Sequence, residues 1–309
     1  MRSANSRVLV IKLGALGDFV LALGAFAAIR AAHATAHVTL LTTAPYVELA
    51  RASGCFDAVW TDQRPSFLQV NRWLGLRARL RDGRFQRVYD LQTSDRSGWY
   101  FRLMGPQRPE WSGIAPGCSH PHANPRRDFM HSLDRQAEQL AAAGIAEAPP
   151  PDLSWARADI ARFGLPARYA ILAPGGAAHR PEKRWPAERF AALARVIAAR
   201  GATPAMVGGG DEIGLADTIS GAAPQVRNLV GETSLLELAT IARGAAGAVG
   251  NDTGPMHVAA VAGCPTVVLF SAASDPALTA PRGSSVVVLA KPSLSELSLD
   301  EVAAALRLR

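Results

Sequence analysis

The sequence predicts an α/β protein made of two Rossmann-like domains, each built on a parallel sheet, that face each other across a cleft. Three observations predict this fold class. Short apolar runs alternate with helical segments, a pattern typical of βαβ units. Three consecutive prolines, Pro149–Pro151, interrupt the alternation, which then starts again. The chain of 309 residues is long enough for two cores. We therefore expect domains at residues 1–150 and 151–309, with a last helix that can pack back on the first domain.

The first domain is predicted to alternate strands and helices from residue 7 onwards. Its predicted strands are Arg7–Leu13, His37–Thr42, Ala58–Thr61 and Arg87–Leu91. Its predicted helices are Asp18–Ala32, Pro45–Ser53, Phe67–Asp82 and Leu133–Ala143. Gly144 follows the last of these helices, as expected where a helix ends. Residues 113–127 are rich in Gly, Pro, His and Asn without a period, so we expect a loop there.

The second domain repeats the alternation after the prolines. Its predicted strands are Tyr169–Ala173, Thr203–Val207, Ala246–Val249 and Thr266–Phe270. Its predicted helices are Pro186–Arg200, a segment ending near Ser220, Ser234–Arg243 and Met256–Ala262. Proline is favoured in the first turn of a helix, as at Pro186. Loops rich in glycine or charge follow several of these strands, and ligands of open α/β sheets bind at that edge.

The composition favours a cytoplasmic globular protein. Charged residues make up 19% of the chain and apolar residues 49%. The apolar run near the start, Val8–Ile11, is too short for the core of a signal peptide. The three cysteines, Cys55, Cys118 and Cys264, are odd in number and far apart, which argues against a disulfide framework.

Positive charge is concentrated in one window of the first domain. Between Arg64 and Arg135 the sequence has 13 arginines and six acidic residues, so this window alone accounts for the formal net charge of +7. Such a field favours an anionic partner, namely phosphate, nucleic acid or an acidic membrane surface. A solvated arginine-rich surface is the alternative. Lysine is scarce, with only three in the chain: Lys12, Lys183 and Lys291.

The segment Gly14–Asp18 is the first candidate site. It directly follows the first predicted strand, and its glycines permit a tight turn. Asp18 falls at the start of the next predicted helix, where it could be a catalytic base or simply the helix cap. The spacing of the glycines is not that of a dinucleotide-binding fingerprint.

Two loops of the second domain have the composition of an anion site. Pro174–Pro186 contains glycines, a histidine, two arginines and Lys183, so that backbone N–H groups and cations could meet a phosphate. An ordinary basic surface loop is the alternative. Gly250–His257 lies between a strand and a helix, whose N-terminus favours negative charge. His257 taken alone is better explained as a buried, hydrogen-bonded histidine.

A metal ion is not indicated by the sequence. The stretch Cys118–His122 contains one cysteine and two histidines, but a second half of such a site is missing. No Asp-x-Asp motif occurs in the chain. A diphosphate held at helix N-termini would not need a cation.

Taken in order, three segments resemble the family-9 glycosyltransferases, the group of ADP-heptose:lipopolysaccharide heptosyltransferases. They are Lys12–Asp18 (KLGALGD), Lys183–Pro186 (KRWP) and Asn251–His257 (NDTGPMH). Asp90–Gln92 and His131–Gln136 are also similar to the family. The resemblance spans nearly the whole chain. It implies a GT-B architecture, with the acceptor on the N-terminal domain and the nucleotide sugar on the C-terminal domain.

The resemblance also implies roles for single residues. Asp18 and Lys183 are implied to be catalytic, Asp18 as the base that activates the acceptor hydroxyl and Lys183 as the cation on the diphosphate of the sugar donor. The implied donor-binding residues are Gly175, His179, Arg180, Lys183, Asp211, Thr233, Asp252, Thr253, Gly254 and His257. The implied acceptor-binding residues are Gly17, Asp18, Gln92 and Arg96. Family members often carry a hydroxyl residue just before the lysine loop, where this chain has Ala178 and His179.

The implied reaction is an inverting transfer of heptose from ADP-heptose to a lipopolysaccharide core acceptor. A base takes the acceptor proton while cations and helix N-termini stabilise the departing diphosphate. No cofactor, metal or nucleic-acid partner is implied. A phosphorylated lipid acceptor would give the basic window a role, and the enzyme would then work in the cytoplasm, peripherally attached to the inner face of the membrane.

Three other functions stay open. One is a transferase of the same family with another nucleotide sugar or a protein acceptor. The second is a related epimerase that processes the nucleotide sugar without an acceptor. The third is a non-catalytic protein that binds nucleotide sugars or nucleic acid. Asp18 separates these classes, because a binding module has no use for a carboxylate that faces the reacting carbon.

Overall fold

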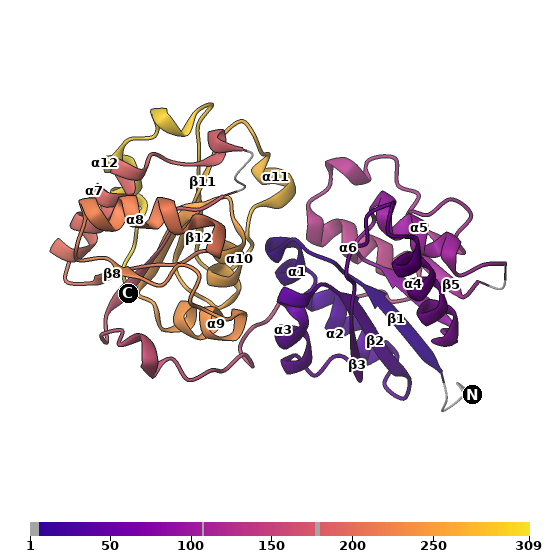
Figure 1. The fold of residues 1–309 in the computed structure, drawn as a ribbon. Helices are drawn as coiled ribbons and strands as arrows, with labels where there is room; N and C mark the ends of the chain where they lie inside the picture. The colour runs from indigo at the N-terminus through magenta and orange to yellow at the C-terminus, as the bar shows by residue number, and fades with distance from the viewer. Residues whose placement is uncertain (1–5, 107, 177–179) are drawn as a thin grey trace. The chain divides into compact units, whose positions relative to one another are not determined.

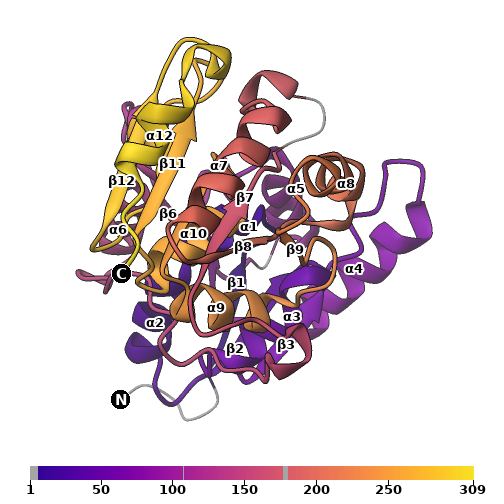
Figure 2. The same ribbon diagram turned by 90° about the vertical axis from the view of Figure 1, so that its left-hand side faces the viewer.

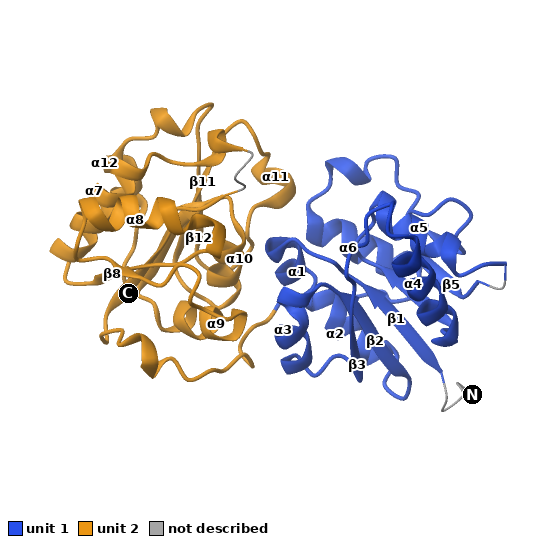
Figure 3. Cartoon of the chain, in the orientation of Figure 1, with its two compact units in different colours: residues 1–151 blue, residues 152–309 orange. Residues whose placement is uncertain are grey.

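The computed structural model describes residues 6–106, 108–176 and 180–309. The chain divides into two compact units, Met1–Pro151 and Asp152–Arg309 (Figure 3). Each unit is a parallel sheet with helices packed on it (Figure 1). The two Rossmann-like domains predicted from the sequence are therefore confirmed.

The sheet of the first unit has the order β3-β2-β1-β4-β5-β6, and all neighbouring strands are parallel. The strands are β1 (Arg7–Ile11), β2 (His37–Thr42), β3 (Ala58–Thr61), β4 (Arg87–Asp90), β5 (Glu110–Gly113) and β6 (His120–Pro121). The helices are α1 (Leu16–Leu21), α2 (Leu23–Ala32), α3 (Val47–Ala52), α4 (Val70–Asp82), α5 (Asp95–Leu103) and α6 (Ser132–Ala142). Leu80 of α4 and Tyr100 of α5 share a core cluster with Ile11, so these helices cover that face of the sheet.

The sheet of the second unit has the order β12-β11-β10-β7-β8-β9 and is also parallel throughout. The strands are β7 (Tyr169–Ala173), β8 (Thr203–Met206), β9 (Arg227–Asn228), β10 (Gly247–Asn251), β11 (Thr266–Phe270) and β12 (Val286–Ala290). The helices are α7 (Ala187–Ala199), α8 (Ile213–Ala222), α9 (Leu235–Gly244), α10 (Gly254–Val261), α11 (Pro276–Thr279) and α12 (Leu299–Ala305). The core of this unit combines residues of α7, α8 and α12 with the sheet.

Both sheets have the same topology when their strands are counted in chain order. In each unit the first strand lies between the second and the fourth, which is the doubly wound order with one point where the direction of winding reverses. That switch point lies between β1 and β4 in the first unit and between β7 and β10 in the second. Ligands of such sheets bind outside the carboxyl ends of the strands at the switch point.

The predicted helix Asp18–Ala32 is wrong as one continuous element. The structure has two helices, α1 and α2, which are separated at Ala22. In α2, a Cβ at Gly24 would lie 1.9 Å from the carbonyl oxygen of Pro149. Glycine at this position therefore lets the proline segment at the end of the first unit lie directly against the helix.

Several short elements were not predicted from the sequence. They are α5, α11, β5, β6, β9 and β12. The predicted loop 113–127 contains β6, which has only two residues and therefore no periodic signal. The helix α5 begins with a capping box formed by Ser94 and Ser97, a signal that was present in the sequence but is weak without glutamate or glutamine at the third position.

The last helix, α12, is part of the core of the second unit. Val302 and Ala303 are buried there, and α12 packs against α7. One face of this helix is thus used within its own unit, and its return to the first domain stays a prediction. Among the described residues, no helix combines the length and the apolar character that a membrane span requires.

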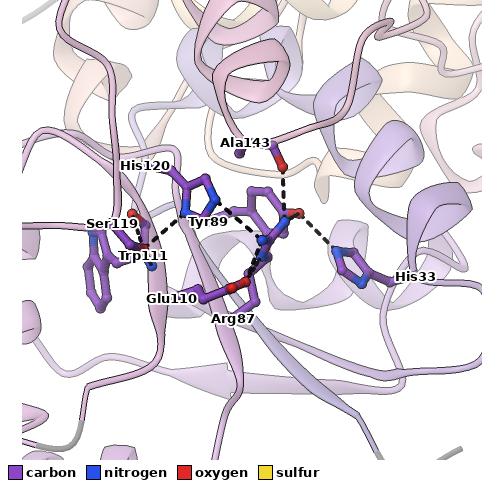
Figure 4. A network of polar contacts seen from close by, with 8 residues as sticks. All are labelled: His33, Arg87, Tyr89, Glu110, Trp111, Ser119, His120 and Ala143. Atoms are coloured by element: carbon purple, nitrogen blue, oxygen red, sulfur yellow. Dashed lines mark hydrogen bonds and ion pairs between the residues drawn. The ribbon is translucent and has the colours of Figure 1, made fainter. Parts of the chain in front are cut away.

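Arg87 shows that part of the basic window serves the fold. Its guanidinium, at the start of β4, forms an ion pair with Glu110 of β5 and donates to the Ala143 carbonyl oxygen at 2.9 Å (Figure 4). It also lies 3.4 Å from the ring nitrogen of His120 in β6, which contacts the Ser119 hydroxyl. Arg87 therefore connects β5, the edge strand β6 and the end of α6 to β4.

Candidate functional site

The loop after β1 is fixed at the switch point of the first unit. Gly14 has a φ of +125°, and a Cβ there would lie 2.8 Å from the ring of Tyr46, so only glycine fits. The Leu13 N–H donates to the side-chain oxygen of Gln92 at 2.8 Å. The Thr43 hydroxyl donates to the Leu13 carbonyl oxygen at 3.0 Å. A side chain that follows β4 thus holds the loop that follows β1.

Asp18 lies in the first turn of α1, at the carboxyl edge of the sheet, and is half-buried. The residue in the N-cap position is Ala15, so the interpretation of Asp18 as the helix cap is wrong. The first turn nevertheless favours a carboxylate through the helix dipole. Gly17 precedes Asp18 in the same turn, and Gln92 lies across the switch point. The structure therefore brings three of the four predicted acceptor-binding residues to one edge.

Two buried charges behind this loop were missed by sequence analysis. Lys12 is 4% exposed, and its ammonium donates to the Leu91 carbonyl oxygen at 3.1 Å. Asp90 is fully buried, and its carboxylate accepts from the N–H groups of Gln92 at 3.1 Å and Thr93 at 3.0 Å. Burial raises the pKa of Asp90 to about 6 and lowers the pKa of Lys12. The sequence did contain one signal for a buried charge: Lys12 directly follows an apolar strand in a chain that has only three lysines.

Arg96, the fourth predicted acceptor-binding residue, lies on α5. Its guanidinium donates to the Pro65 carbonyl oxygen through both terminal nitrogens, each at 3.3 Å. It also lies 5.6 Å from the ring centroid of Trp73. Arg96 therefore supports the segment before α4, and its contact with an acceptor stays a prediction.

Asn251 organises the switch point of the second unit. Its side chain is fully buried at the end of β10. The amide nitrogen donates to the carbonyl oxygens of Pro174 at 2.7 Å and Gly175 at 3.0 Å. The amide oxygen accepts from the Trp185 N–H at 3.0 Å. Both ends of the basic loop after β7 are thus fastened to one side chain, a role that sequence analysis did not assign.

Lys183 and Asp252 form an ion pair at this switch point. The distance between Lys183 Nζ and Asp252 Oδ2 is 2.9 Å, and both side chains are largely shielded from solvent. Lys183 ends the short 3-10 turn Pro181–Lys183, and Asp252 directly precedes the N-cap residue of α10, Thr253. The structure therefore brings together two predicted donor-binding residues that are 69 positions apart in the sequence.

Glu212 occupies space that sequence analysis assigned to an anion. Its carboxylate accepts from the N–H groups of Gly176 at 3.0 Å and Gly209 at 3.1 Å. A Cβ at Gly175 or Gly208 would lie within 2.1 Å of its oxygens. Burial raises the pKa of this carboxyl group. The glycines therefore make room for Glu212. Because the Gly176 N–H already donates to this carboxylate, the prediction that it is available to a phosphate is wrong.

The remaining predicted donor-binding residues differ in their environment. Thr253 is the N-cap residue of α10, and Gly254 is its first helical residue. His257 is buried on the same helix, as expected for the histidine taken alone. Arg180 and Asp211 are exposed. Thr233, half-buried, directly precedes the N-cap residue of α9, and His179 lies outside the described residues.

The Cys118–His122 stretch has protein partners. The Cys118 thiol donates to the Gly113 carbonyl oxygen at 3.7 Å, and the ring of His122 lies 3.5 Å from the Glu138 carboxylate. Within residues 6–106, 108–176 and 180–309, no group of three or more His, Cys, Asp or Glu side chains is arranged to hold a metal ion.

Comparison with known proteins connects this geometry to one family. The model of glycosyltransferase family 9 (heptosyltransferase) matches residues 73–301. Lipopolysaccharide heptosyltransferase 2 of Escherichia coli K12 is 26% identical over 308 residues, which cover 89% of this chain and 85% of that protein. Lipooligosaccharide heptosyltransferase 2 of Haemophilus influenzae is 30% identical over 119 residues. That second match covers 37% of this chain and only 34% of the length of the relative.

The solved structures share the fold. The structure of the E. coli ADP-heptose lipopolysaccharide heptosyltransferase II superimposes with a TM-score of 0.79 and 21% identity, covering 97% of each chain. At this level of identity the likeness supports the GT-B class and leaves the substrates open.

Proposed function

The chain belongs to glycosyltransferase family 9, and from this membership we propose that it transfers a heptose from ADP-heptose to a lipopolysaccharide core acceptor. The reaction is proposed to invert the anomeric carbon and to need no metal ion. The observation that carries the proposal is the Lys183–Asp252 ion pair at the N-terminus of α10, beside a loop that Asn251 holds in place. The relatives named above are heptosyltransferases, which supports the choice of sugar.

The diphosphate of the sugar donor is proposed to bind at this ion pair. Lys183 supplies a cation whose position is set by Asp252, and exposed Arg180 adds positive charge to the same loop. The N-terminus of α10 favours negative charge through its free N–H groups and its dipole. These groups would stabilise the charge that develops on the leaving ADP.

Asp18 is proposed to be the general base. The acceptor hydroxyl loses its proton to the Asp18 carboxylate while its oxygen attacks the anomeric carbon. The bond from that carbon to the diphosphate oxygen breaks on the opposite face, so ADP leaves and the configuration inverts. The position of Asp18 at the carboxyl edge, just after the loop whose Leu13 N–H is held by Gln92, supports this role. This mechanism also requires the two domains to face each other across a cleft, and we propose that they do.

The acceptor is proposed to be an anionic, lipid-anchored core saccharide. The first unit offers the arginine-rich window for its phosphates, although Arg87 and Arg96 are engaged within the fold. The enzyme would work in the cytoplasm at the inner face of the membrane. A different nucleotide sugar is the second candidate, because this chain lacks the hydroxyl residue that family members often carry before the lysine loop.

A thermal-shift panel of ADP, UDP, GDP and their sugar conjugates tests the sugar donor. A ligand at about 100 times its Kd stabilises the folded state by about 2.7 kcal/mol, which raises the melting temperature by several degrees. ADP and ADP-heptose are expected to produce this shift, and UDP and GDP are not. A shift with UDP alone would replace ADP-heptose by another donor. Nuclear magnetic resonance of the product then reports the anomeric configuration.

A further inference from the structure

Exposed apolar side chains are concentrated just before and within α4. Among the described residues, nine large apolar side chains are exposed, and four of them lie within the eight residues 67–74. These are Phe67, Leu68, Val70 and Leu74, with exposures of 79%, 93%, 59% and 53%. Single exposed apolar residues are ordinary, but a contiguous group of them marks an interaction surface.

The helix α4 buries very little of its own surface. Of its 13 residues only Leu80 is fully buried, while Trp73 and Leu76 are half-buried against the core of the first unit. In Figure 2 α4 is a long helix at the outside of this unit. Its first two turns therefore present Val70 and Leu74 to the surroundings without an internal partner.

The segment that carries Phe67 and Leu68 is held by specific contacts. The indole N–H of Trp73 donates to the Ser66 carbonyl oxygen at 3.0 Å. The Ser66 N–H donates to the Gln69 side chain at 3.1 Å, and the rings of Phe67 and Trp73 stack at 6.5 Å. The two apolar side chains are thus presented by a folded platform, so little ordering entropy is lost when they bind.

Arginines border these apolar residues. Residues 64–84 contain six arginines and one acidic residue, Asp82. Arg79 lies over the Trp60 ring, 4.3 Å from its centroid, and Arg64 and Arg77 are exposed. On α4, Arg77 is seven residues from Val70 and three from Leu74 and lies on their side of the helix, whereas Arg72 is two residues from each and faces the other way. An apolar patch flanked by exposed cations matches the interfacial region of a bilayer, where acyl chains lie below anionic headgroups.

We propose that this surface, called here the apolar–basic face and formed by Phe67, Leu68, Val70, Leu74, Arg64 and Arg77, docks the protein on a bilayer with anionic headgroups. The four apolar side chains enter the headgroup region, and the two arginines contact phosphates. Four apolar side chains can give only shallow, reversible attachment. Neither the apolar side chains nor the arginines would hold the protein on a membrane alone, so binding requires both.

The location of the face is consistent with delivery of a lipid-anchored substrate. The segment after β3 leaves the sheet at its carboxyl edge, because all strands of this sheet are parallel. β3 lies two strands from β1, a distance of about 10 Å. Asp18 follows β1 at the same edge. Docking does not depend on heptose transfer, so it can be tested with neither sugar donor nor acceptor present.

The test is co-sedimentation of the full chain with phosphatidylcholine vesicles, with and without phosphatidylglycerol. We expect binding to the anionic vesicles and a loss of roughly 100-fold in Phe67→Ser/Leu68→Ser, since two large apolar groups no longer enter the interface. Arg64→Glu/Arg77→Glu should lose at least about 25-fold, or about fivefold for each charge removed, and with it the preference for phosphatidylglycerol. The matched control is Val287→Ser/Val288→Ser, which removes two exposed apolar side chains from β12 of the second unit.

Two results would overturn the proposal. The first is binding of Phe67→Ser/Leu68→Ser at the level of the parent, or an equal loss in the control. The second is a change of oligomeric state in size-exclusion chromatography without vesicle binding, which would assign the face to a protein contact. Leu68→Ser alone serves as a second variant, because a side chain that is 93% exposed contributes almost nothing to the fold.

Discussion

The two units have the same strand order, but they differ in the side chains that are buried at their switch points. In the first unit the buried charges Lys12 and Asp90 lie behind the loop after β1. In the second unit the buried group is the neutral amide of Asn251, and the charges of Lys183 and Asp252 lie outside it. In both units a side chain near the end of the fourth strand holds the loop that follows the first.

This difference indicates which charges a ligand can use. Lys12 is 4% exposed and already bonded to the Leu91 carbonyl oxygen, so it can act only through its field on neighbours such as Asp18. Lys183 and Asp252 retain some solvent contact and lie at the start of a helix. We infer that the first unit is organised for proton transfer and the second for binding a diphosphate, and the predictions below test that division.

The largest effect is expected for Asp18→Asn. Loss of a general base costs about 10²–10⁴-fold in rate. Because Ala15 is the N-cap residue, the substitution removes no cap and should leave the melting temperature nearly unchanged. Turnover with saturating sugar donor is the measurement, and ADP affinity by calorimetry should be that of the parent. Near-full activity would move the base elsewhere, and a fall in ADP affinity would contradict the division between the units.

Lys183→Ala is expected to reduce turnover by roughly 100-fold or more and to weaken ADP binding as well. The cation would no longer balance the leaving diphosphate, a loss typical of single electrostatic groups in active sites. Lys291→Ala is the matched control, because Lys291 also forms an ion pair, with Glu301, but lies near the end of the second unit. Equal effects of the two substitutions would mean that net charge matters rather than the position of Lys183.

Much of the fold could be predicted from the sequence because the central strands are continuous apolar runs. The runs at β1, β7 and β11 are buried on both faces, which is the pattern that a parallel sheet requires. The elements that were missed lack this signal. β6 and β9 have two residues each, and β12 lies at an edge where three of its five residues are exposed.

The candidate site could be predicted only where a residue lies between the end of a strand and the first turn of the next helix. Asp18, Lys183 and Asp252 all lie in such segments, so the alternation of strands and helices places them at the carboxyl edge of a sheet. The role of Glu212 could not, since it depends on two glycine loops that approach one carboxylate from different strands. The same limit applies to the pairing of Lys183 with Asp252, which is a contact between segments far apart in the chain.

A smaller effect is expected on the pH dependence of stability. The pKa of Asp90 is raised from 3.8 to about 6 in the folded protein, so the folded state holds this proton more tightly than the unfolded chain. The resulting contribution to stability is fully present below pH 4 and is lost as the pH rises to 6, a change of about 3 kcal/mol at most. Asp90→Asn retains the acceptor for the Gln92 and Thr93 N–H groups. Urea unfolding at several pH values should therefore show a flatter profile between pH 4 and 6 in this variant. An unchanged slope would show that the buried charge of the first unit is not what titrates.

The smallest effect, none at all, is expected from a chelator. In the second unit the cation beside Asp252 is Lys183, and the N-terminus of α10 adds partial positive charge. If these groups carry the leaving diphosphate, transfer in excess EDTA should proceed at the rate of the untreated enzyme. Added Mg²⁺ should leave both that rate and the affinity for ADP unchanged. A loss that Mg²⁺ or Mn²⁺ restores would mean that Asp252 holds a metal ion rather than orienting Lys183. In that case Lys183→Ala should have little effect at saturating metal, so the two experiments together decide which cation the second unit uses.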